Sequence, residues 1–166
     1  MVERLLIQPT KIVETTSPVI FLAGPIQGAP DWQSRAAEII HNSDASITVA
    51  SPRRAHPEDT FIYEKQVDWE THFLRRAGRL GVIGFWLAAQ TEETPGRAYA
   101  QTSRFELGEW KVRHEYEQTK LALGIEDGFG NASYIRRRFN QDCPDIQIVD
   151  SLEEMCRNAI DLVSKA

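Results

Sequence analysis

The stretch that decides the fold is "VIGFWLAAQTEETPGRAYAQTSRFELGEW", residues 82–110. It opens with a short apolar run, residues 82–88, which is typical of a strand buried in a parallel sheet. A polar loop containing Pro95 and Gly96 follows, and the pattern from Thr102 to about Glu117 indicates a helix. A strand, a long loop and a helix in this order predict one unit of an α/β sheet, whose ligands bind where the strands end.

The same alternation continues on both sides of this stretch. Further strands are predicted at residues 19–25, 47–52, 120–126 and 146–150, and further helices at residues 31–42, 63–79, 132–139 and 151–163. We therefore predict a single domain over residues 1–166, with residues 1–17 as an edge strand or an extension. Its fold is a three-layer, doubly wound α/β fold of the flavodoxin-like or Rossmann-like kind, with a mostly parallel sheet of about five strands.

Composition excludes several classes of protein. The chain has 166 residues, 42% of them hydrophobic and 26% charged, as expected for a globular domain without a membrane span. A net charge of -5 argues against nucleic acid or an anionic membrane as the partner. Two cysteines without a CxxC pair favour the reducing cytoplasm, and four histidines without HExxH spacing indicate no metal. We also expect no cofactor.

The predicted strand order brings four loops to one edge of the sheet, and the first is rich in glycine. This loop, "GPIQGAP" (residues 24–30), matches neither GxGxxG nor the GxxxxGK[ST] phosphate loop. Dinucleotide binding and a phosphate loop are therefore rejected. Its glycines either make a tight turn or let the backbone approach a ligand closely, and both interpretations stay open.

Two acidic residues lie close together in "YEKQVDWETHFLRRAG", residues 63–78. Helical spacing puts Glu70 on one face with Val67, Leu74 and Ala77, and Asp68 on roughly the opposite side. A charge within an apolar stripe is costly unless it is paired. Glu70 is thus either a structural ion pair with an arginine or a pocket carboxylate with a raised pKa.

A second pair of acids lies in "SRFELGEW", residues 103–110. Glu106 follows the long loop in the first helical turn, where the helix dipole favours acids and where a carboxylate reaches the ligand cleft. We predict an inward stripe of Phe105, Gly108 and Val112, with Gly108 packed closely on the sheet. Glu70 and Glu106 facing one cleft would fit glycosidic bond cleavage, which uses paired carboxylates.

Four blocks in order, "VIFLAGPI" with "DWQ", "QVDWETHFLRRAG", "VIGFWL" and "FELGEW", resemble the nucleoside 2-deoxyribosyltransferase-like family over residues 19–150. The resemblance implies cleavage of the N-glycosidic bond of 2′-deoxynucleosides through a covalent glycosyl–glutamate. It implies that Glu106 is the nucleophile and that Glu70 assists protonation of the base. Relatives complete their pockets across subunits, so we expect a homodimer or a higher homo-oligomer.

Candidate substrate-binding residues come from the first loop and from the neighbourhood of the two glutamates. They are Gly24, Pro25, Ile26, Gln27, Asp68 and Ser103. The chain departs from its relatives at three places. Phe21 stands near the position of an aromatic hydroxyl, no acid lies between Tyr99 and Arg104, and residues 24–28 read GPIQG where related nucleotide hydrolases read GSIRG. Arg97 or Arg104 would have to replace the lost phosphate contacts.

The sequence therefore predicts an enzyme that transfers the sugar of a nucleoside or nucleotide to another base or to water. One alternative keeps the chemistry but takes NAD or another nucleotide as its substrate. The other alternative is a nucleotide-binding module without turnover, because a fold alone does not establish catalysis.

Overall fold

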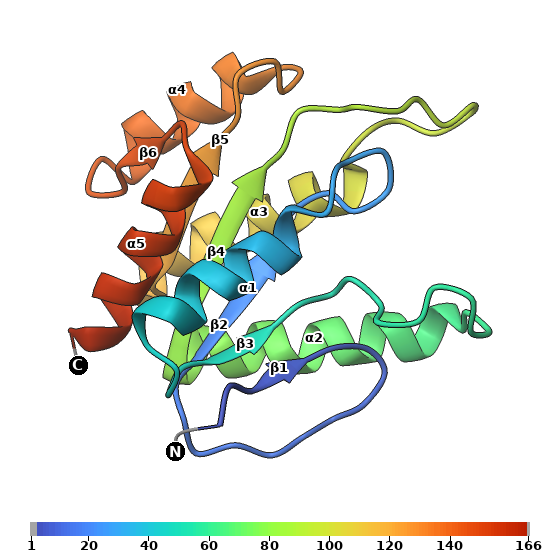
Figure 1. The fold of residues 1–166 in the computed structure, drawn as a ribbon. Coiled ribbons are helices and arrows are strands. Elements are labelled where there is room, and N and C mark those ends of the chain that lie inside the picture. The colour runs from blue at the N-terminus through green and yellow to red at the C-terminus, as the bar shows by residue number, and fades with distance from the viewer. Residues whose placement is uncertain (1–2, 166) are drawn as a thin grey trace.

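The computed structural model describes residues 3–165, which form one sheet of six parallel strands in the order β1-β3-β2-β4-β5-β6 (Figure 1). This confirms the predicted α/β fold class. The sheet has one strand more than the five expected. This additional strand is β1, and it lies in the leading segment that was predicted as an edge strand or an extension. The strands are β1 (Leu6–Ile7), β2 (Val19–Ala23), β3 (Thr48–Ala50), β4 (Gly81–Leu87), β5 (Leu121–Ile125) and β6 (Ile148–Val149).

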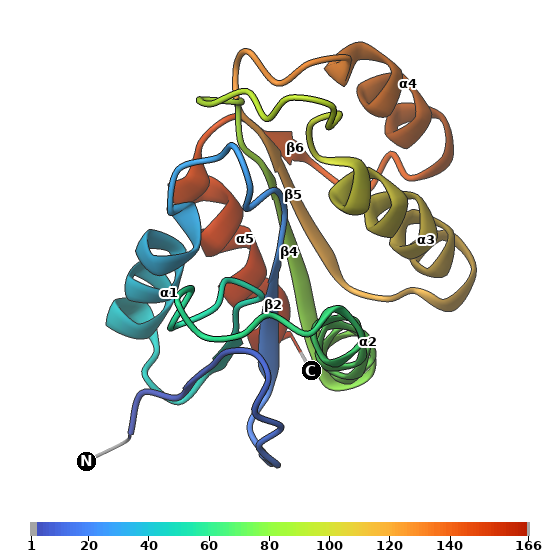
Figure 2. The ribbon, with the colours of Figure 1, turned by 90° about the vertical axis from the view of Figure 1, so that its right-hand side faces the viewer.

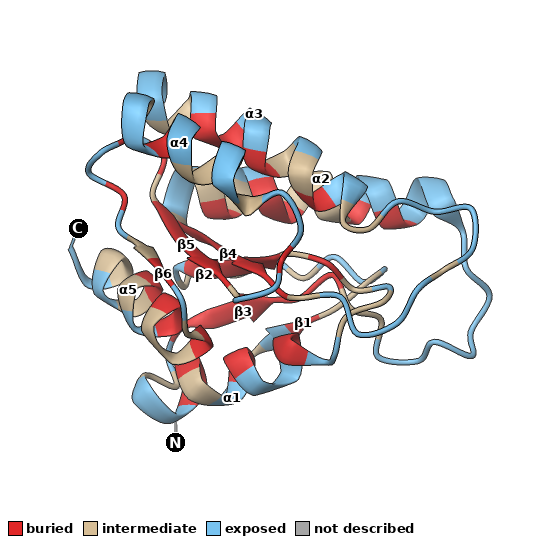
Figure 3. Ribbon diagram, turned by 90° about the horizontal axis from the view of Figure 1, so that it is seen from above, coloured by how far each residue is buried: buried red, intermediate tan, exposed pale blue. Residues whose placement is uncertain are grey.

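Five helices enclose this sheet in three layers (Figures 2 and 3). The helices α1 and α5 cover one face, while α2, α3 and α4 cover the other. Their bounds are α1 (Trp32–Ser43), α2 (Tyr63–Leu80), α3 (Gln101–Glu117), α4 (Ala132–Asp142) and α5 (Leu152–Ser164). No helix within residues 3–165 combines the length and the apolar character that a membrane span requires.

Large apolar side chains fix both helical layers to the sheet. All five residues of β2 are buried, as expected for a central parallel strand. Trp69 and Phe73 anchor α2, and their ring centroids lie 4.8 Å apart. Trp32 and Met155 anchor α1 and α5 on the opposite face. The loops at the carboxyl ends of the strands are therefore held by a rigid frame.

The strand order changes direction at β2, and this places the site. The chain passes from β2 to β3 on one side and later returns to β4 on the other side. Crevices at such switch points are the usual ligand sites of open α/β sheets. The loops after β2 and β4 meet there, since the backbone N–H groups of Thr91 and Glu92 donate to the Gly28 carbonyl at 2.8 and 3.2 Å.

The predicted inward stripe of α3 is wrong. Phe105 and Val112 are 77% and 51% exposed, and a Cβ atom added to Gly108 would meet nothing within 4 Å. Both sides of this helix carry apolar residues, so periodicity alone could not decide which side faces the sheet. Leu107 and Trp110 occupy the buried side, together with Ser103 and Lys111.

Candidate active site

A cavity of about 920 Å³ lies at the switch point. Its walls are the loop after β2, the loop after β3, the first half of α2, the loop after β4 and the start of α3. Both predicted catalytic residues, Glu70 and Glu106, line it. So do five of the six predicted substrate-binding residues: Gly24, Pro25, Ile26, Gln27 and Ser103.

The loop after β2 is fixed by its own backbone geometry. Gly24 has a φ of 154°, and a Cβ atom there would clash with the Trp86 carbonyl oxygen and lie 2.7 Å from a ring carbon of Trp32. The carbonyl of Pro25 accepts hydrogen bonds from Trp32 Nε1 at 2.9 Å and Gln33 Nε2 at 3.3 Å. Gly24 is therefore required both by a tight turn and by close packing, and the next residues border the cavity in a defined conformation.

Glu70 projects from α2 into this cavity without an ion-pair partner among residues 3–165. Gln66, one turn earlier, donates from Nε2 to Glu70 Oε1 at 2.8 Å and to the Pro52 carbonyl at 3.0 Å. Burial raises the pKa of Glu70, and the hydrogen bond from Gln66 partly opposes that rise. Of the two interpretations left open by the sequence, the geometry favours the pocket carboxylate.

Glu106 is partly buried and lies in the second turn of α3, not in the first turn as predicted, because the helix already begins at Gln101. Burial raises the pKa of Glu106 to about 8, and the negative charges of Glu70 and Glu109 contribute to this rise. Since Glu70 and Glu106 influence each other, they titrate as a pair. Near neutral pH this pair retains a proton, which gives the cavity one proton donor and one potential nucleophile.

The loop after β4 contributes an aromatic hydroxyl that the sequence reasoning missed. The Tyr99 hydroxyl donates to the Ala88 carbonyl at 2.7 Å, and burial, followed by the charge of Glu126, raises the pKa of Tyr99 to about 12. Tyr99 borders the cavity, whereas Phe21 is part of the core. Tyr99 lies in a loop without a periodic pattern, so nothing in the sequence indicated that its side chain reaches the cavity.

Arginines also border the cavity. Arg97 does so and donates to Gln27 Oε1, while Arg53 and Arg54 come from the loop after β3. Arg104, the other candidate for a phosphate contact, does not line the cavity. It donates to the Gly130 carbonyl and lies over the Phe129 ring, 4.4 Å from its centroid.

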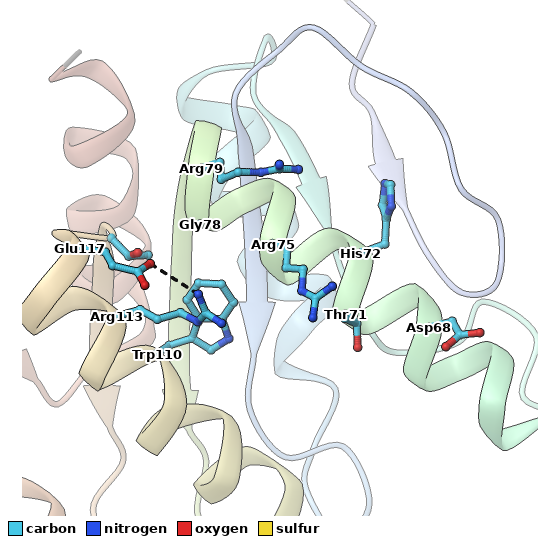
Figure 4. Close-up of a pocket in the computed structure, with 10 residues that line it drawn as sticks. Asp68, Thr71, His72, Arg75, Gly78, Arg79, Trp110, Arg113 and Glu117 are labelled. Atoms are coloured by element: carbon cyan, nitrogen blue, oxygen red, sulfur yellow. Dashed lines mark hydrogen bonds and ion pairs between the residues drawn. The ribbon is translucent and has the colours of Figure 1, made fainter.

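Asp68 lies apart from this cavity. It is exposed on the outer side of α2 and lines a separate groove between α2 and α3 (Figure 4). Two residues along a helix turn a side chain through about 200°, which explains why Asp68 and Glu70 face different surroundings. Within residues 3–165, His, Cys, Asp and Glu form no group of three or more that could hold a metal ion.

A family model described as "nucleoside 2-deoxyribosyltransferase like" matches residues 17–119. The chain belongs to this family. The matched segment runs from just before β2 to the end of α3, and it contains the glycine-rich loop, Glu70 and Glu106. No curated protein matches the chain. Membership indicates the general class, nucleoside deoxyribosyltransferase-like enzymes that act on small molecules.

Proposed function

We propose that this family member cleaves the N-glycosidic bond of a nucleoside-type substrate, with Glu106 as the nucleophile. The observation that carries the proposal is the pair Glu70 and Glu106, which border one cavity at the switch point and hold a proton near neutral pH. A nucleophile and a proton donor are the two groups that a retaining glycosidic cleavage requires. Glu70 takes the role of proton donor, and the hydrogen bond from Gln66 holds its carboxyl group in place.

In the first step, the ionised Glu106 carboxylate forms a bond to the anomeric carbon of the sugar. The bond from that carbon to the base nitrogen breaks, and its electron pair stays on the base. The leaving base takes up a proton from Glu70 or from a water that Glu70 orients. Because burial raises the pKa of Glu106 to about 8, the proton of the pair must pass from Glu106 to Glu70, directly or through a water, before the attack, and the departing base then takes up this proton.

In the second step, the nitrogen of another base or a water oxygen attacks the anomeric carbon. Glu106 leaves as a carboxylate, and Glu70 accepts the proton of the incoming group. Transfer requires that the incoming base excludes water from the intermediate. The loop after β4 borders the cavity where this incoming group would bind, and the hydroxyl of Tyr99 ties that loop to Ala88.

A nucleotide substrate is the second candidate, and two arginines favour it. Arg54 donates only to backbone carbonyls, and Arg97 donates only to an amide oxygen, so neither has an acidic partner within residues 3–165. Guanidinium groups free of acids are suited to phosphate. A nucleoside and its 5′-monophosphate should therefore be compared, and Arg97→Ala should raise KM only for the monophosphate.

Trapping of the intermediate tests the proposed chemistry directly. A nucleoside with fluorine at the sugar 2-position and a good leaving base should leave a stable adduct, because fluorine destabilises the oxocarbenium-like transition states. The intact mass should rise by that of the fluorinated sugar, and peptide mapping should locate the adduct on Glu106. Glu109→Gln is the matched control, since Glu109 lies one turn away outside the cavity and should not affect labelling.

Other outcomes of this experiment have definite meanings. Release of base without an adduct, with inversion at the sugar, would replace the covalent mechanism by direct attack of water. Release of nicotinamide from NAD, but of no base from nucleosides, would move the substrate to the NAD class. Saturable binding without any release would contradict the enzymatic proposal and favour a binding module.

A further inference from the structure

The outer groove between α2 and α3 is a second cavity, of about 650 Å³, and the proposed chemistry does not use it (Figure 4). No residue of the described chain lines both this groove and the active-site cavity. The volume of the groove lies within the range of pockets that hold small ligands. Its lining includes Arg75, Gly78 and Arg79 from α2 and Trp110 and Arg113 from α3.

Two arginines of this groove have no acidic partner. Arg75 and Arg79 lie one helical turn apart, both are exposed, and neither forms an ion pair within residues 3–165. Like charges at this spacing destabilise a helix. An anion that contacts both guanidinium groups would remove this repulsion, and guanidinium groups are well suited to phosphate.

The indole of Trp110 lines the same groove and carries a donor without an acceptor. Trp110 is only 3% exposed, and its Nε1 has no hydrogen-bond partner within the described part of the chain. By contrast, Trp32 and Trp69 donate to the carbonyls of Pro25 and Lys11, each at 2.9 Å. Buried polar atoms are nearly always hydrogen-bonded, so the N–H group of Trp110 is suited to an acceptor supplied by a ligand.

Packing holds this indole in one position. Its Cζ3 and Cη2 atoms lie against Gly78 of α2, where an added Cβ atom would be 2.5 and 2.8 Å from them. The Arg113 guanidinium lies over the ring, 5.0 Å from its centroid, and is paired with two acids of its own helix. Because Gly78 lies between Arg75 and Arg79 in the sequence and lines the same groove, the indole contacts α2 beside both arginines.

The acids of the groove do not neutralise these two arginines. Asp68 precedes Arg75 by two helical turns, which is about 10 Å along the axis of α2. Glu117 is paired with Arg113, with 3.4 Å between their charged atoms. The end of the groove beside the two arginines is therefore positively charged, although the chain carries a net charge of -5.

We propose that the outer groove binds a small molecule through a phosphate group, at the end formed by Arg75, Arg79 and Trp110. The two guanidinium groups neutralise the phosphate, and one of its oxygens accepts a hydrogen bond from the indole N–H group. A phosphate group offers three oxygens to these three donors, whereas a carboxylate offers only two. The proposal is independent of the chemistry assigned to the cavity.

The indole N–H signals in a proton–nitrogen correlation NMR spectrum test this site directly. Inorganic phosphate and ribose 5-phosphate are titrated separately at constant ionic strength, and Trp110→Phe identifies the Trp110 signal. This signal should shift saturably, because its N–H group gains an acceptor, and the tighter ligand shows whether the phosphate is free or linked to a sugar. Trp32 is the internal control, since it donates to the Pro25 carbonyl beside the active-site cavity and would respond to binding there.

Substitution of the arginines distinguishes this site from other basic surfaces. Arg75→Gln and Arg79→Gln should each raise the dissociation constant at least about tenfold, since each removes one charge-assisted contact. Arg137→Gln, at an exposed position of α4, is the matched control and should change the constant less than about twofold. A shift of the Trp32 signal alone, the absence of saturation by about 10 mM of either ligand, or unchanged binding by Arg75→Gln would each overturn the proposal.

Discussion

The two sides of α2 show how burial changes the chemistry of one residue type. Glu70 projects into the cavity beside a second carboxyl group, and burial raises its pKa. Asp68, two residues earlier, is exposed on the outer surface. The same contrast recurs on α3, where Glu106 lines the cavity and Glu109 pairs with Arg113 outside it.

The difference follows from the cost of removing a charge from water. An exposed carboxylate stays solvated, and its ion pairs contribute about 0–1 kcal/mol. A buried carboxyl group instead retains its proton, and two such groups raise each other's pKa. On the proposed mechanism, the inner side of both helices supplies the acids for proton transfer and bond formation, whereas the outer side carries charges that stay solvated. Substitutions that compare Glu70 with Asp68, and Glu106 with Glu109, should separate these roles.

The largest difference in turnover should be that between variants of Glu106 and Glu109 on α3. We expect Glu106→Gln to reduce release of base at least about a thousandfold, because the amide cannot form the glycosyl ester. Glu109→Gln, the matched control, should change turnover less than about twofold, since it lies at the surface. Chromatography of released base and the thermal midpoint should be measured together. Near-normal turnover of a folded Glu106→Gln variant would exclude Glu106 as the nucleophile.

Substitution of Glu70, on the inner side of α2, should give the second-largest loss of activity. We expect Glu70→Gln to slow base departure about a hundredfold, the usual size of a general acid contribution. Substrates with a more acidic leaving base should be affected less, because they need less protonation. Stability should change little, since Glu70 has no ion-pair partner within residues 3–165. A large loss of stability with normal specific activity would instead indicate a structural role.

Burial of Glu106 also predicts a pH dependence of stability. Its pKa rises from the ordinary value of 4.5 to about 8 on folding, so the folded state binds the proton more tightly. The resulting stabilisation is fully present below pH 4.5 and is lost as the pH rises toward 8. Between these limits the free energy of unfolding should fall by roughly 4 kcal/mol more in the native chain than in Glu106→Gln. Urea unfolding at several pH values measures this difference, and parallel curves would contradict it.

The sequence was sufficient for the fold and for much of the cavity. Apolar runs and helical spacing located the strands and helices, because buried parallel strands carry little polar character. Glu70 was detectable as a charge on an apolar face. The orientation of α3 was not predictable, because apolar residues lie on both of its sides: Phe105 and Val112 on one, Leu107 and Trp110 on the other.

The sequence did not predict those cavity residues whose position depends on how the loops pack. Tyr99 reaches its place through a hydrogen bond to Ala88, which no periodic pattern encodes. Gln66 is on the predicted helix, but its bonds to Pro52 and Glu70 depend on how the loop after β3 packs. The groove that holds Asp68 likewise requires the relative placement of two helices. Such contacts arise from tertiary packing, which local sequence does not specify.

The smallest effect is expected at Asp68, which the sequence assigned to substrate binding. Asp68→Asn should change KM and kcat less than about twofold, because a surface substitution away from the cavity alters few interactions. Glu70→Gln assayed in parallel provides the contrast between the two sides of one helix. If Asp68→Asn raises KM about tenfold, the outer groove takes part in substrate binding, and the contrast between an inner catalytic side and a solvated outer side of α2 fails.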